Sequence, residues 1–179
     1  MSDPPVIDGS RVRLRPMRVA DAAALHDIYS DAEAMTWWTH APFDRLEETE
    51  AKLTKNLAAD DWRAWSITLV GDDTAIGTLA VNDKRQGGVA EIGYSLVRCH
   101  WGTGLAREAV SLMISFLFEV EGYRRIFADT DPDNAASNGL LTRLGFTLEG
   151  RLRGEWETHI GVRDSLIWGL LREEWSGPV

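Results

Sequence analysis

Two glycines one residue apart, Gly102 and Gly104, have the spacing that most directly predicts chemistry in this chain. Residues 90–97, just before them, place aromatic and β-branched residues between small ones, as a strand does. The apolar residues after them recur at helical spacing and predict a helix over 105–120. A strand that enters a helix through a glycine-containing loop directs free backbone N–H groups and the positive helix end at one point. The sequence therefore predicts an anion site, for which phosphate is the usual ligand.

The glycine loop differs from the two commonest phosphate loops. A P-loop has a lysine and then a serine or threonine after its last glycine, where this chain has Leu105 and Ala106. A dinucleotide-binding loop has a third glycine where this chain has Arg107. The window 101–106, Trp-Gly-Thr-Gly-Leu-Ala, instead resembles the acetyl-CoA pyrophosphate loop of the GCN5-related N-acetyltransferases, Gln/Arg-x-x-Gly-x-Gly/Ala. Trp101 replaces the opening Gln or Arg, as in the branch resembling the ribosomal-protein N-terminal (Rim-type) acetyltransferases.

A second motif follows about thirty residues downstream, at the next predicted helix. Asn134 and Ser137 lie at the start of this helix, and Gly145 and Phe146 follow its end. Taken alone, these residues describe an ordinary capped amphipathic helix, with residues 131–134 as the start signal and Gly145 at C′. The GCN5-related family carries an Asn and often a Ser at this place, with Gly-Phe leading into a strand. The two motifs together identify the chain as resembling a member of that family.

Composition agrees with a single enzyme domain. At 179 residues, with 44% of them hydrophobic and no internal repeat or linker, the chain is expected to form one acetyltransferase domain over 1–179. The net charge of −9 argues against nucleic acid or an anionic membrane as a partner, and it suits either a cationic substrate or solubility alone. The single cysteine, Cys99, rules out an internal disulfide and fits a reducing compartment. Residues 1–9 are polar and predict no signal peptide, so we expect a cytoplasmic protein.

The resemblance implies an α/β (α+β) fold. It consists of a mixed, mostly antiparallel seven-stranded sheet that is splayed at its centre and flanked by about four helices. Helices are predicted to begin at Asp21, near Asp44, at Leu105 and at Asn134, the second of them running to about residue 60. We expect the arginines of 11–15 to form the solvated face of an edge strand rather than a phosphate patch. The residue pattern predicts strands at 11–16, 62–70, 75–81, 90–97, 147–152 and 165–171.

The resemblance also implies which residues hold acetyl-CoA, the expected co-substrate. The backbone from Gly102 to Arg107 would form the pyrophosphate cradle, and Leu96 and Val97 would offer strand N–H groups to the pantetheine and the thioester carbonyl. Arg98 and Arg107 would add charge near the phosphates, although each is equally a candidate surface residue. Asn134 would either bond to the cofactor arm or cap its own helix. The expected cofactor-binding residues are Leu96, Val97, Arg98, Trp101, Gly102, Thr103, Gly104, Leu105, Ala106, Arg107 and Asn134.

The family reaction moves an acetyl group from a thioester to a primary amine by direct attack and needs no metal. Many relatives protonate the leaving thiolate with a Tyr four residues before the glycine of Gly-Phe, where this chain has Leu141. Ser137 matches the serine of the Rim-type branch, and its alternative role is a structural helix-start residue. Glu91 matches a strand glutamate that withdraws the amine proton; burial would raise its pKa, whereas a structural Glu91 would pair with an arginine. Lesser candidates for the base are Glu155, Glu157, His159 and Asp164.

The resemblance places Trp37, Trp38 and His40 beside the acceptor amine. Adjacent tryptophans point in different directions, so at least one is exposed or lines a cleft, with core packing as the alternative for the pair. His40 is either a base or an incidental loop histidine. The acceptor would be a protein or peptide N-terminal amine, as in the Rim-type branch, or a small amine such as an antibiotic. A non-catalytic CoA-binding sensor is a further alternative, and exposed tryptophans would also suit a homodimer.

Overall fold

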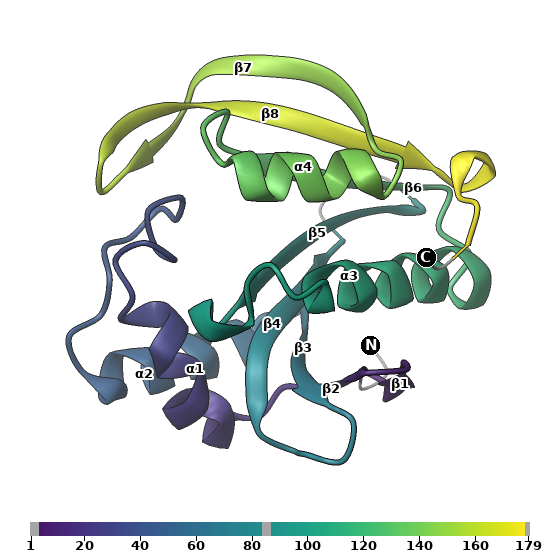
Figure 1. Ribbon diagram of the computed structural model, residues 1–179. Helices are drawn as coiled ribbons and strands as arrows, with labels where there is room; N and C mark the ends of the chain where they lie inside the picture. The colour runs from purple at the N-terminus through teal and green to yellow at the C-terminus, as the bar shows by residue number, and fades with distance from the viewer. Residues whose placement is uncertain (1–3, 84–86, 178–179) are drawn as a thin grey trace.

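The computed structural model describes residues 4–83 and 87–177, so the first three residues of the expected polar start lie outside it. It contains an eight-stranded sheet in the order β1-β2-β3-β4-β5-β6-β8-β7 (Figure 1). All neighbouring strands are antiparallel except β5 and β6, which are parallel. The strands are β1 (Ile7–Asp8), β2 (Val12–Pro16), β3 (Trp62–Leu69), β4 (Ala75–Asn82), β5 (Val89–Leu96), β6 (Arg125–Thr130), β7 (Thr147–Thr158) and β8 (Gly161–Leu171).

Six of these strands coincide with strands predicted from the residue pattern, and the sheet has eight strands instead of seven. The added edge strand, β1, has only two residues and is too short to show a period. The residue pattern does not predict β6, because the two large apolar residues of Arg125–Thr130 are adjacent instead of alternating with polar ones. The mixed, mostly antiparallel class of fold is confirmed.

The sheet is splayed at its centre, as expected. Parallel pairing of β5 with β6 involves only three residue pairs and ends at Glu91 and Phe127. β5 continues to Leu96 and β6 continues to Thr130 without further pairing between them. The two strands therefore part just before the glycine loop, which leaves backbone groups on both facing edges without a strand partner.

Four α-helices cover the two faces of the sheet. α3 (Leu105–Ser115) and α4 (Ala135–Arg143) pack in one apolar cluster with Trp65 and Ile67 of β3, whereas α1 (Ala22–Tyr29) and α2 (Leu46–Leu57) pack in a second cluster with Ala64. Because strand side chains alternate between faces, the two helix pairs lie on opposite faces of the sheet. The predicted helix over 105–120 is α3 followed by a π-helical turn, Phe116–Val120. α2 ends before residue 60, and its N-cap is Arg45.

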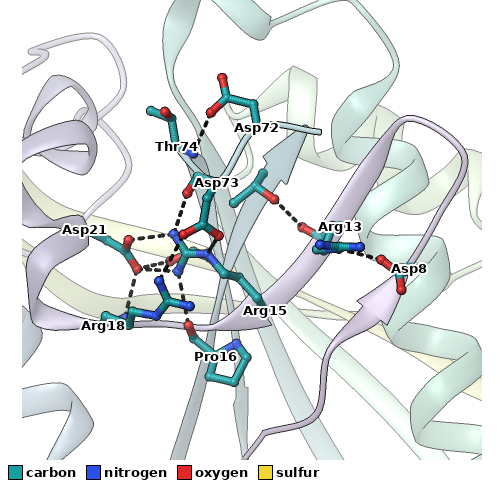
Figure 2. A network of polar contacts seen from close by, with 11 residues as sticks. Asp8, Arg13, Arg15, Pro16, Arg18, Asp21, Asp72, Asp73 and Thr74 are labelled. Atoms are coloured by element: carbon teal, nitrogen blue, oxygen red, sulfur yellow. Dashed lines mark hydrogen bonds and ion pairs between the residues drawn. The ribbon is translucent and has the colours of Figure 1, made fainter. Parts of the chain in front are cut away.

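A buried ion pair corrects the expectation that Arg15 is solvated and gives the side chain of Asp21, the N-cap residue of α1, a role other than capping (Figure 2). Arg15 is not on a solvated face, since its side chain is only 4% exposed, and its two terminal nitrogens donate to Asp21 over 2.8 and 2.7 Å. Asp21 precedes α1, but its side chain makes no capping bond there and accepts instead from Arg15, Ser66 and the Arg18 N–H. The sequence pattern could not distinguish a capping aspartate from one that pairs with a buried arginine. The pair fixes the start of α1 to β2 and β3.

Candidate active site

Both glycines of the loop adopt left-handed backbone angles. After β5 the chain makes a short 3-10 turn, Arg98–His100, and then passes through Gly102 (φ +72°) and Gly104 (φ +82°) into α3. Gly104 is the N-cap residue of that helix. A Cβ at either position would be strained, because L-residues rarely adopt positive φ. Glycine is thus required for the backbone path that begins α3.

Several backbone donors of the loop have no hydrogen-bond acceptor among the described residues. Within residues 4–83 and 87–177, the N–H groups of Gly102, Thr103 and Gly104 have no recorded acceptor. The first N–H groups of α3 have no intrahelical partner by geometry, and the positive end of the helix dipole lies there. The Nε atom of Arg107 is buried without a hydrogen-bond partner in the same part of the chain. These donors fit an anionic ligand such as the pyrophosphate of acetyl-CoA.

Trp101, at the opening position of the loop motif, ties the loop to β5 through a hydrogen bond from its indole. Its Nε1–H donates to the Leu96 carbonyl over 2.8 Å, while 42% of the residue stays exposed. This bond joins the glycine loop to the last residue of β5. It gives the tryptophan a structural reason to occupy a position where many relatives have Gln or Arg.

The structure corrects one of the two expected strand donors. The Val97 N–H is donated to the Ile76 carbonyl over 2.9 Å, so it is not free for a ligand. In an antiparallel ladder the N–H groups of successive residues point to opposite sides. Since Val97 points toward β4, the N–H of Leu96 points toward the gap between β5 and β6. Of the two residues, only Leu96 has an N–H group directed as expected for a ligand.

Two arginines near the loop, Arg98 and Arg11, make contacts that the sequence did not predict. Arg98 bonds to carboxylates of the α1–α2 loop, which we define as residues 30–43, through Asp31 at 2.7 and 2.5 Å and through Glu33. Arg11 is exposed, as expected, but it also donates to the Thr103 carbonyl over 3.1 Å and to Glu108 over 2.8 Å. Its guanidinium lies 3.4 Å from the position that a Cβ on Gly104 would occupy. Arg11 is therefore a cation beside the loop that the sequence pattern did not reveal.

A pair of hydroxyl groups lies where the face of β5 that packs on α3 meets α4. The side chains of Ala90, Ile92 and Leu96 belong to the cluster that packs on α3, and Tyr94 shares their face by alternation. The Tyr94 and Ser137 hydroxyls are 2.8 Å apart, and burial raises the pKa of Tyr94 to about 12. Sequence analysis missed Tyr94, because the family tyrosine belongs on α4, where Leu141 is fully buried instead.

Asn134 caps α4, which was the structural alternative to bonding with the cofactor arm. Its Oδ1 accepts the Ser137 backbone N–H over 3.1 Å. Its Nδ2 group has no partner recorded in the part of the chain that the structure describes. One side chain can therefore both hold the first turn of α4 and keep a donor for a ligand. The cap also fixes the position of the Ser137 hydroxyl.

Two carboxylates occupy the opposite face of the splayed strands. Glu91 alternates with Ala90 and Ile92, so it points away from α3 and α4, and Asp129 on β6 does the same by alternation with Ala128. Asp129 accepts from Trp156 Nε1 over 3.0 Å and from the Ser165 hydroxyl. Sequence analysis did not propose Asp129, because the strand that carries it was not located. Both carboxylates therefore lie on the face of the sheet opposite α3 and α4.

The free end of the β7–β8 hairpin lies next to the α1–α2 loop, as Figure 1 shows at the left. His159, at the turn, donates from Nδ1 to the Trp38 carbonyl over 3.1 Å. Trp37 is 37% exposed, whereas Trp38 packs against the α1–α2 cluster, so the two tryptophans do point in different directions. His40 stacks on Phe43 with ring centroids 4.6 Å apart, and burial lowers its pKa.

Comparison with known proteins places this arrangement in a family. The family model described as "Acetyltransferase (GNAT) domain" matches residues 11–147. The chain belongs to the GNAT acetyltransferases. The N-acetyltransferase p20 of Bacillus licheniformis is 33% identical over 93% of this chain and 96% of its own length. The crystal structure of a GCN5-related N-acetyltransferase from Brucella melitensis has a TM-score of 0.87 and 26% identity, covering 97% of this chain and 81% of that one.

A relative with a narrower name matches only part of this GNAT chain. The [ribosomal protein uS5]-alanine N-acetyltransferase of Escherichia coli is 35% identical over 48% of this chain and 44% of its own length. The family membership makes this protein an N-acetyltransferase, and it agrees with the loop, the splay and the Asn-Ser helix start. Among the described residues, no helix is long and apolar enough to cross a membrane.

The GNAT cradle gives a first prediction. Gly104→Val should lower the affinity for acetyl-CoA at least about tenfold, or roughly 1.4 kcal/mol, because Val strains the left-handed backbone and pushes against Arg11. Isothermal titration calorimetry measures this loss. Gly71→Val is the matched control, since Gly71 also has positive φ (+89°) but nothing lies within 4 Å of its missing Cβ. Equal affinity in the Gly104 variant and the parent would contradict the assignment of the loop.

Proposed function

We propose that this GNAT protein transfers the acetyl group of acetyl-CoA to the N-terminal amine of a protein or peptide. The observation that carries the proposal is the splay of β5 from β6 after Glu91, with different chemistry on its two sides. The glycine loop and the Tyr94–Ser137 pair lie toward α3 and α4, and two carboxylates lie toward the α1–α2 loop. A gap of this kind lets a thioester and an amine approach each other from opposite faces of the sheet.

Cofactor binding in this proposal uses backbone groups more than charge. The donors of residues 102–107 and the N–H of Leu96 hold the phosphates and the pantetheine arm. Arg107 adds positive charge at the loop, and Arg11, paired with Glu108, lies beside it. Asn134 Nδ2 donates to the same arm. Since Arg98 is bonded to two carboxylates, its charge is already compensated. Bound acetyl-CoA supplies the activated acyl group and the thiolate leaving group.

Proton transfer is divided between the two faces. Glu91 accepts a proton from the acceptor ammonium, which leaves a neutral amine that attacks the thioester, and Asp129 holds the acceptor site together through Trp156. Ser137 donates a hydrogen bond to the thiolate as it develops, while the Tyr94 hydroxyl, which stays protonated with its raised pKa, donates to Ser137. A donor that acts on charge present only in the transition state raises kcat more than it strengthens binding.

A second prediction tests the hydroxyl pair. Ser137→Ala should lower kcat by roughly tenfold, as expected for loss of one transition-state hydrogen bond. The affinity for acetyl-CoA should stay within about twofold of the parent's, and the melting temperature should change by no more than a few degrees. Tyr94→Phe removes the neighbouring hydroxyl without moving the ring and should give a smaller loss of kcat in the same direction. Steady-state kinetics and melting curves separate the cases. Loss of cofactor binding or of stability in Ser137→Ala would instead make Ser137 a structural residue of the helix start.

The choice of a peptide acceptor rests on a relative and on charge. The partial match to an enzyme named for a ribosomal-protein alanine supports an N-terminal amine. The net charge of −9 and the carboxylates at the gap favour a cationic acceptor. A polyamine is the second candidate, because a spermidine N(1)-acetyltransferase from Escherichia coli is 24% identical over 92% of this chain and 88% of its own length.

The test is a screen of thiol release from acetyl-CoA against three sets of acceptors. Short peptides with free N-termini, polyamines such as spermidine, and aminoglycosides should be compared at equal concentration, with N-acetylated peptides as the control. Turnover with free peptides but not with their acetylated forms supports the proposal. Preferred turnover of spermidine would favour the second candidate function, acetylation of a polyamine. Tight CoA binding without turnover of any amine would favour a non-catalytic sensor.

A further inference from the structure

Arg98 connects two loops that are far apart in the sequence. It lies in the 3-10 turn between β5 and the glycine loop, and its three bonded nitrogens donate to Asp31 and Glu33 of the α1–α2 loop. The guanidinium also lies over the Trp101 ring, 5.9 Å from its centroid. A planar guanidinium that donates two bonds to one carboxylate and a third to another fixes direction as well as distance. Few side chains could hold the two loops in one relative position so specifically.

The charge around Arg98 argues against a role in binding phosphate. One guanidinium faces two carboxylates, so this group of three side chains carries one net negative charge. A phosphate placed there would meet that charge and would have to compete for N–H groups that are already bonded. Arg107 is better placed for the cofactor, since its buried Nε has no partner among the described residues. Arg11 lies at the loop itself and is paired with one carboxylate, Glu108, instead of two.

Asp31 links Arg98 to the backbone of the α1–α2 loop, because its carboxylate bonds to both. Its Oδ1 accepts the N–H groups of Glu33 and Ala34 over 2.8 and 2.9 Å, which closes the first turn of the loop. Its own carbonyl accepts the Met35 N–H over 2.9 Å, and Met35 in turn accepts from Trp38 over 3.1 Å. Bonding by Arg98 is the main reason that the pKa of Asp31 falls to about 2. The turn that positions Trp37 and Trp38 thus begins at the carboxylate held by Arg98.

We propose that Arg98 is a positioning residue that couples the glycine loop to the α1–α2 loop, so that binding of CoA orders the acceptor side of the active site. The inference rests on the proposed function, because it assumes that CoA binds the glycine loop. Coupling between sites is reciprocal, so a well-ordered α1–α2 loop also favours the CoA-bound form of the glycine loop.

Hydrogen exchange followed by mass spectrometry tests the coupling without an acceptor. Peptides covering residues 31–43 should exchange at least threefold more slowly when CoA is added to the parent protein. Arg98→Gln should keep CoA affinity within about twofold by calorimetry but lose this added protection, and Arg98→Lys, with its charge but no fork, should recover part of it. Asp31→Asn keeps an oxygen for the Glu33 and Ala34 N–H groups and should behave like Arg98→Gln.

The control is Arg13→Gln, another exposed arginine whose side chain bonds to a carboxylate, Asp8, away from the site. It should leave CoA protection of residues 31–43 unchanged. Equal protection in Arg98→Gln and the parent would overturn the coupling while leaving cofactor binding intact. A tenfold loss of CoA affinity in Arg98→Gln, with Asp31→Asn unaffected, would make Arg98 a phosphate ligand instead. Absence of CoA binding by the parent protein would overturn both the coupling and the proposed function.

Discussion

Glu91→Gln is expected to lower kcat/KM by about 10²–10⁴-fold near neutral pH, the usual range for loss of a general base. Gln keeps the shape of the side chain and one carbonyl oxygen, but it cannot accept a proton. Glu91 is the last β5 residue paired with β6, and it points toward the face of the α1–α2 loop. A base at this position would reach an amine that enters the gap. The measurement is a pH–rate profile of the variant and the parent.

The profile should change in a way that a structural defect cannot reproduce. Part of the lost activity should return at higher pH, because more of the amine then arrives already deprotonated. If Glu91 served only to stabilise the sheet, the loss would follow a lower melting temperature and would not recover with pH. Melting curves taken at each pH separate the two cases. A variant with the parent's profile would exclude Glu91 as the base.

Asp129→Asn is the matched comparison, because Asp129 is the other carboxylate on the same face. Its oxygens already accept from Trp156 and Ser165, and the Asn oxygen can keep one of these bonds. We expect less than about a tenfold loss of kcat/KM, in the range of one weakened hydrogen bond, without recovery at high pH. A larger loss than in Glu91→Gln, with recovery, would assign the base to Asp129 instead.

Features encoded in contiguous residues were predictable from the sequence. The glycine loop, its left-handed path and the helix after it depend on Gly102, Gly104 and the apolar spacing beyond them, which are local properties. The start of α4 was equally local, since Asn134 caps its own third following residue. The splay followed from the family resemblance, and the pairing of β5 with β6 confirms it.

Contacts between distant residues could not be predicted. Arg98 and Asp31 are 67 residues apart, Tyr94 and Ser137 are 43 apart, and the Arg11 side chain meets Glu108 over a separation of 97. A single sequence does not show which of several arginines will meet which carboxylate. The same limit explains Val97, whose N–H is directed by its register with β4, and Asp129, whose strand had no clear period.

The largest effect on stability is expected at the buried ion pair of Figure 2. Arg15→Met should lower the free energy of unfolding by about 3–5 kcal/mol, because it leaves Asp21 buried and without its counter-charge. Asp73→Asn is the control: Asp73 bonds to the same arginine but is 66% exposed, so its replacement should cost less than about 1 kcal/mol. Denaturant unfolding of both variants measures the difference.

The double variant Arg15→Met/Asp21→Asn should be more stable than the sum of its single changes predicts. Asn at position 21 keeps an oxygen for the Ser66 hydroxyl and the Arg18 N–H, and no unpaired charge remains. Burial alone would raise the pKa of Asp21, but the bonds from Arg15, Ser66 and Arg18 outweigh it and hold that pKa below 3.8. The stability that Asp21 contributes is therefore complete above pH 3.8 and falls as the pH drops through the lower, folded-state pKa. This acid-dependent part should be absent from the double variant. Strict additivity, or an unchanged acid profile, would show that the two side chains do not stabilise the fold as a pair.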